Sequence, residues 1–126
     1  MPIEINVVER KNPQDLSQPA KFYASTQSRG FIDLNGLSKQ LAMMSTVSKG
    51  DVYAVLVSLT EVIPQYLEDG KIVKLGSLGS FRIALTSKPS DTAEEVTTAN
   101  VKQLRLRYRP TNELKAQVES FPVIKG

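Results

Sequence analysis

Three arginines stand at alternate positions in the segment VKQLRLRYR (residues 101–109), and their spacing suits the binding of phosphate groups. They are Arg105, Arg107 and Arg109. Alternate residues of a β-strand share one face and lie about 7 Å apart, so the three guanidinium groups could reach successive phosphates of a nucleic acid. The segment therefore predicts a polyanion-binding surface. The same pattern is also compatible with a solvated sheet face, or with arginines paired to acids of residues 91–95.

A second candidate for phosphate binding is the glycine pair in VKLGSLGSF (residues 73–81). A P-loop needs a longer spacing, a Gly-Lys pair and a following helix, none of which is present. A KH-type GxxG clamp lies between helices, whereas both flanks here alternate with the period of strands. The glycines Gly76 and Gly79 therefore predict a tight turn or bulge between two strands.

The composition argues against catalysis. The 126 residues include no cysteine and no histidine, which removes thiol chemistry, zinc–thiolate sites, the commonest general base and the commonest metal ligand. We expect a non-enzymatic protein without cofactor, metal or small-molecule substrate. No apolar run is long enough to span a membrane, and the N-terminus does not resemble a signal peptide. We therefore expect a cytoplasmic protein.

Periodicity places these segments in an α+β fold with the order β-β-α-α-β-β-arm-β-α. Two short strands precede residue 30, and the period then becomes helical, with Asp33 and Ser48 as the expected helix caps. Pro64 should kink the second helix, which we expect to end near Glu68. The remaining expected elements are strands 71–75, 80–86 and 101–109, a polar arm or loop between the last two, and a helix after Thr111.

The charge is unevenly distributed along the chain. Residues 31–70 carry five acids and two lysines, whereas residues 101–109 carry four cations and no acid. The net charge of +3 is thus the sum of an acidic helical segment and basic strands. This polarity agrees with a sheet that binds a polyanion.

Three local motifs, taken with this order of elements, resemble the bacterial histone-like HU and integration host factor family. They are LSKQLA in the first helix, the turn SLGSF, and RYRPTNELK at the end of the last long strand. The extra N-terminal strands are similar to those of longer HU-related variants. We therefore expect one domain overall, with a β extension over residues 1–30 and an HU-like domain over residues 31–126.

The resemblance implies an intertwined homodimer with a helical body, a basic β-saddle and β-ribbon arms that reach around double-stranded DNA. It implies a nucleoid-associated architectural protein that binds DNA with little sequence preference. Leu78, Phe81 and Tyr108 match positions of the dimer core. The expected DNA-binding residues are Lys74, Arg82, Lys88, Pro89, Lys102, Arg105, Arg107, Arg109 and Lys115.

The arm departs from the family pattern, which has an Arg-Asn-Pro tip with basic neighbours. Here Lys88 and Pro89 are followed by Asp91, Glu94 and Glu95, and acids near a tip would repel phosphates. The family's Gly-Lys after the last strand is replaced by Thr111 and Asn112. An alternative function is therefore a dimeric protein-interaction module that keeps the HU fold and has weak or no DNA binding.

Overall fold

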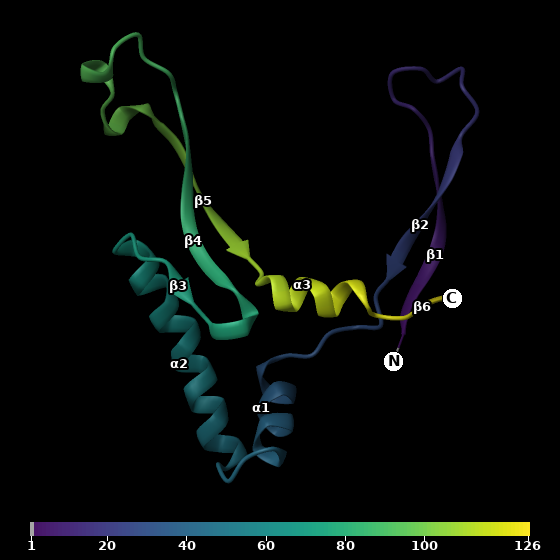
Figure 1. Ribbon diagram of the computed structural model, residues 1–126, viewed down its shortest axis with the longest axis vertical. Helices are drawn as coiled ribbons and strands as arrows, with labels where there is room; N and C mark the ends of the chain where they lie inside the picture. Colours follow the sequence, from purple (N-terminus) through teal and green to yellow (C-terminus); the bar gives the residue numbers. More distant parts are fainter. Residues whose placement is uncertain (1) are drawn as a thin grey trace. The chain divides into compact units, whose positions relative to one another are not determined.

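The computed structural model describes residues 2–126 and contains three α-helices and two small three-stranded sheets (Figure 1). The chain divides into two compact units. One unit comprises the N-terminal residues up to Ile32 together with Gln117–Gly126, and the other comprises Asp33–Ala116. An α+β chain was expected, but the sequence did not predict that the C-terminal residues join the N-terminal unit.

The first unit is built on the strand order β2-β1-β6. Strands β1 (Ile3–Arg10) and β2 (Lys21–Gln27) form an antiparallel hairpin. Strand β6 (Val123–Lys125) pairs parallel to β1, with Ile3 opposite Val123. The third strand was missed in the sequence because three residues carry no periodicity of their own.

The second unit begins with two helices whose N-terminal caps agree with the sequence. Helix α1 (Leu34–Met43) follows Asp33, whose side chain accepts a hydrogen bond from the Gly36 amide at 2.9 Å. Helix α2 (Lys49–Glu68) follows Ser48, whose hydroxyl accepts from the Asp51 amide at 3.2 Å. These bonds satisfy amides that have no partner within the helix. Helix α2 continues through Pro64, so the proline does not end it.

The second sheet has the order β3-β4-β5, with antiparallel neighbours. Its strands are β3 (Val73–Lys74), β4 (Ser80–Ser87) and β5 (Val101–Arg109). Phe81 lies opposite Tyr108 and Leu85 opposite Leu104, so the apolar residues of β4 and β5 share one face. The predicted alternation is confirmed along both long strands, up to a shift of register between Thr86 and Ser87.

Residues 88–100 connect β4 to β5 through two short turns of 3-10 helix, Ala93–Glu95 and Thr98–Asn100. The loop closes where the Lys88 amide donates to the Asn100 carbonyl at 2.7 Å and the Asn100 side chain donates back to the Lys88 carbonyl at 3.0 Å. Figure 1 shows this loop at the end of the long β4–β5 hairpin. The segment is thus a projecting arm with its own hydrogen bonds.

Helix α3 (Asn112–Glu119) begins after Thr111, whose hydroxyl accepts from the Leu114 amide at 3.1 Å. Thr111 is therefore the helix cap expected from the sequence. Of the residues that the structure describes, only Ser38, Gly79 and Ser80 are buried, and no large apolar side chain is. None of the described helices has the length and hydropathy needed to cross a membrane.

Candidate nucleic-acid interface

Four arginines share the polar face of the β3-β4-β5 sheet. Arg82 lies directly opposite Arg107, while Arg105 and Arg109 lie opposite Ala84 and Ser80. In residues 2–126 no acid forms an ion pair with any of the four. The arginines therefore present an unneutralised row of guanidinium groups, and the pairing with acids of residues 91–95 that the sequence left open is not formed. We call these four residues the arginine face.

Arg82 is the most enclosed member of the arginine face. It is half-buried, one terminal nitrogen lies 3.4 Å from the Ser80 hydroxyl, and its buried Nε has no hydrogen-bond partner. A guanidinium carries five N–H donors in a planar fork that fits a phosphate. Arg82 is thus partly enclosed by the sheet, and its terminal nitrogens are the donors that an anion could reach.

The opposite face of β4 and β5 is apolar and open to solvent. The rings of Phe81 and Tyr108 contact each other with centroids 5.2 Å apart. Leu104 and Leu106 are nevertheless 64% and 61% exposed. Leu78, expected in a dimer core, is also exposed in the single chain. Much of this face is therefore exposed in the single chain.

The turn between β3 and β4 is fixed to the end of β5, and its glycines have a structural role. The Tyr108 hydroxyl donates to the Leu78 carbonyl and the Thr111 hydroxyl donates to the Ser77 carbonyl, each at 2.5 Å. Gly79 has a φ of +126°, and a Cβ there would lie 2.2 Å from the Arg109 carbonyl oxygen. Only glycine fits this close approach.

Lys74 and Arg109 line a common hollow of about 260 Å³ beside this turn. Gly76, Ser80 and Thr111 also line it. The sequence placed Lys74 at a strand end with no defined direction. Lys74 and Arg109 both pair with Ser80, from opposite sides of β4, so the two cations lie at the same end of the sheet and could contact one phosphate group.

The remaining candidate residues lie apart from the arginine face. Lys102 stands at the shift of register, where β5 has one residue more than β4. Lys88 is exposed at the closing pair of the arm, and Pro89 follows it at the beginning of the loop and not at its centre. Lys115 is exposed on α3.

The comparison with protein families agrees with this geometry. The family HU-HIG, described as an HU domain fused to wHTH, Ig, or glycine-rich motif, matches residues 1–125. This chain belongs to the HU-HIG family. A comparison with curated proteins found no match. The resemblance drawn from LSKQLA, SLGSF and RYRPTNELK is thereby confirmed at the level of the family.

Membership of HU-HIG covers the β1–β2–β6 unit as well as the helices and the β3-β4-β5 sheet, since the match extends over nearly the whole chain. The sequence did not reveal two features of this HU-HIG chain. One is the hydrogen bond from the Thr111 hydroxyl to the Ser77 carbonyl, which fixes the turn. The other is the hollow shared by Lys74 and Arg109, which depends on strand pairing between distant segments.

Proposed function

We propose that this HU-HIG protein is a non-enzymatic architectural DNA-binding protein that holds duplex DNA on its arginine face. Family membership supports a DNA-binding architectural role. The observation that carries the proposal is the register of β4 and β5, which gathers Arg82, Arg105, Arg107 and Arg109 on one face, with no acidic partner among the described residues 2–126. A nucleoid location in the cytoplasm follows from this role.

Binding is expected to depend mainly on backbone phosphates. Arginines two residues apart on a strand are about 7 Å apart, which lets neighbouring side chains reach successive phosphates. Phosphate contacts fix the position of a protein on a duplex but carry no sequence information. Lys74, which lines the same hollow as Arg109, would add a contact at that end of the sheet. The proposed binding is therefore largely independent of sequence and strongly dependent on salt.

We also propose a homodimer in which the apolar face of β4 and β5 is covered by a second copy. Six side chains on this face or beside it are exposed by about two fifths or more: Leu78, Ile83, Leu85, Leu104, Leu106 and Tyr108. Burial of one such leucine is worth about 1.5–3 kcal/mol, so leaving the whole face in water is costly. Light scattering at micromolar concentration should give twice the chain mass of 13.9 kDa. A monomer mass would contradict the dimer.

The DNA proposal is tested by titrating labelled duplex with the wild type and with the variant Arg105→Ala/Arg107→Ala, called here the row variant. A charge-assisted hydrogen bond is worth about 1.5–3 kcal/mol, so the row variant, which loses one at each of two arginines, should bind at least about a hundredfold more weakly. The matched control is Lys39→Ala/Lys49→Ala, which removes two exposed cations from α1 and α2. The control should bind about as well as the wild type.

A protein-interaction module is the second candidate function, and the acidic arm favours it. Residues 88–100 contain three acids, Asp91, Glu94 and Glu95, and Lys88 is their only cation. Such an arm would be repelled by a duplex but could meet a basic protein surface. If the wild type shows no duplex binding even at low salt, this candidate replaces the DNA-binding proposal.

A further inference from the structure

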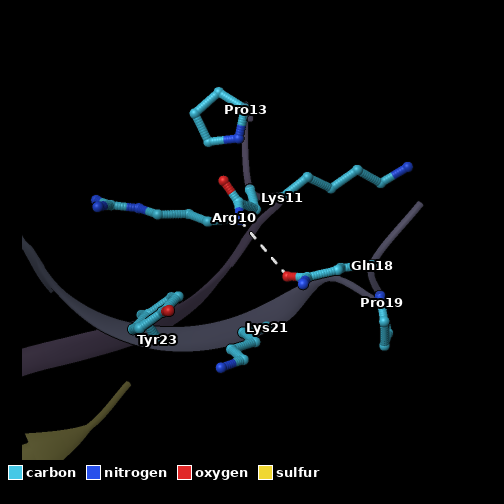
Figure 2. Close-up of a pocket in the computed structure, with 8 residues that line it drawn as sticks. Arg10, Lys11, Pro13, Gln18, Pro19, Lys21 and Tyr23 are labelled. Atoms are coloured by element: carbon cyan, nitrogen blue, oxygen red, sulfur yellow. Dashed lines mark hydrogen bonds between the residues drawn. The ribbon is translucent and has the colours of Figure 1, made fainter. Parts of the chain in front are cut away.

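The tip of the β1–β2 hairpin holds a hollow of about 470 Å³ lined by cations and amides (Figure 2). Its charged residues are Arg10, Lys11 and Lys21, and none of the residues that line it is acidic. In Figure 2 the ends of these three side chains point away from one another. In the part of the chain that the structure describes, none of the three forms an ion pair.

Strand pairing places the backbones of two of these cations opposite each other. Arg10 is the last residue of β1 and lies directly opposite Lys21, the first residue of β2. Like charges opposite each other on a sheet destabilise it, and a bound anion would offset that repulsion. The guanidinium of Arg10 lies 5.9 Å from the centroid of the Tyr23 ring, within the range of a cation–π contact. Arg10 is thereby held over the stem of the hairpin.

The loop between the two cations is organised by its own hydrogen bonds. Asn12 and Asp15 accept from amides two residues further on, at 3.0 Å from Gln14 and 3.1 Å from Ser17. Asp15, the only acid of the loop, also accepts from the Ser17 hydroxyl at 2.5 Å. The bond from the Ser17 hydroxyl, and to a smaller extent the bond from the Ser17 amide, holds the pKa of Asp15 below its usual value. The carboxylate is thus occupied within the loop and does not neutralise Arg10 or Lys21.

The two hairpins of the chain have opposite charge at their tips. Residues 10–21 of the β1–β2 hairpin contain three cations and one acid, whereas residues 88–100 of the β4–β5 hairpin contain one cation and three acids. The cations that the family pattern places at the tip of the β4–β5 arm are largely replaced by acids here, and the tip of the other hairpin is the cationic one. Backbone phosphate is the ligand that fits a hollow rich in N–H donors and free of carboxylates.

We propose that the β1–β2 tip is a second binding site for DNA backbone phosphate, in which Arg10 and Lys21 hold the phosphate and Tyr23 positions Arg10. This inference rests on the proposed DNA-binding function and adds a contact outside the arginine face. On this proposal the N-terminal strands contact DNA directly, in addition to the β3-β4-β5 sheet.

The test compares the salt dependence of duplex binding by the full chain in four forms. They are the wild type, Arg10→Ala/Lys21→Ala, the milder pair Arg10→Gln/Lys21→Gln, and the control Lys39→Ala/Lys49→Ala. Each lost phosphate contact makes the slope of log K against log salt shallower by about 0.9, so both hairpin variants, which lose the one phosphate that Arg10 and Lys21 share, should have slopes shallower by about 0.9. The control should keep the wild-type slope. Circular dichroism checks that each variant is folded, and the Gln pair keeps the stem of each side chain.

A second measurement locates the contact. The chain has no cysteine, so Leu16→Cys in the exposed loop gives a single attachment site for a photo-crosslinker. Crosslinking to duplex is expected, and inorganic phosphate at constant ionic strength should not abolish it. Loss of crosslinking in phosphate, without a change of slope in the hairpin variants, would show a site for free phosphate and overturn the proposal.

The outcomes separate this inference from the proposed function. If the row variant loses affinity while both hairpin variants keep the wild-type affinity and slope, the second site is rejected and the arginine face stands. If the wild type does not bind duplex at all, both proposals fail together.

Discussion

Arg82 of β4 and Arg107 of β5 lie directly opposite each other on one face of the sheet, and neither forms an ion pair with an acid in residues 2–126. A like-charge pair in this position destabilises a sheet by about 0.2–1 kcal/mol. A bound polyanion would turn the repulsion into two favourable contacts.

The pair predicts opposite effects of one substitution on stability and binding. Arg107→Ala should leave the free energy of unfolding unchanged or raise it by up to about 1 kcal/mol, because it removes the repulsion from Arg82. The same change should weaken duplex binding. Chemical denaturation at low salt and a duplex titration measure the two effects. A variant that is clearly destabilised would show that Arg107 has a structural role instead.

Gly79 is expected to tolerate no side chain. Gly79→Ala should destabilise the fold by about 1–3 kcal/mol or more, because φ is +126° and the new Cβ would clash with the Arg109 carbonyl. Gly50→Ala is the matched control, since Gly50 lies in α2 with no atom within 4 Å of an added Cβ. The control should be neutral or stabilising by up to about 1 kcal/mol. Thermal or chemical denaturation compares the two, and equal stabilities would contradict the role of the turn.

Thr111 should matter through its hydroxyl group. Thr111→Ala removes the cap of α3 and the hydrogen bond to Ser77, so we expect a loss of about 1–3 kcal/mol in the free energy of unfolding. Thr111→Ser keeps the hydroxyl and should lose much less. If the Ala and Ser variants unfold at the same denaturant concentration, the two hydrogen bonds do not stabilise the fold.

Local patterns were enough to predict much of the second unit. The caps at Asp33 and Ser48 and the alternation of β4 and β5 depend on residues a few positions apart. Pairing between distant segments could not be predicted in the same way. Strand β6 has only three residues and acquires its structure from β1, more than a hundred residues earlier.

In the candidate site, too, local patterns could be predicted and pairing between distant segments could not. The alternation of Arg105, Arg107 and Arg109 was readable directly, but the position of Arg82 opposite Arg107 depends on the register of two strands. The proximity of Arg10 and Lys21 depends equally on pairing, since a ten-residue loop separates them in the sequence. The sequence also gave no signal for the shift of register that leaves Lys102 outside the row, because that shift arises only when β5 pairs with β4.

The acidic arm predicts weak bending of DNA. Glu94 and Glu95 lie in a turn of the arm, where their charges would oppose approach to a duplex. Glu94→Gln/Glu95→Gln should therefore raise duplex affinity a few-fold at low salt, an effect of about 1 kcal/mol that salt screens. An end-to-end distance measurement on labelled DNA should show little change with the wild type bound. Strong shortening of that distance would contradict an arm that stays away from the duplex.

The salt dependence of duplex binding tests the central claim most directly. For the wild type, log K should fall linearly with log salt, and the slope of the row variant should be shallower by about 1.8, the contribution of two phosphate contacts. Lys39→Ala/Lys49→Ala should reproduce the wild-type slope. Equal slopes for the wild type and the row variant would contradict the claim that Arg105 and Arg107 bind backbone phosphates.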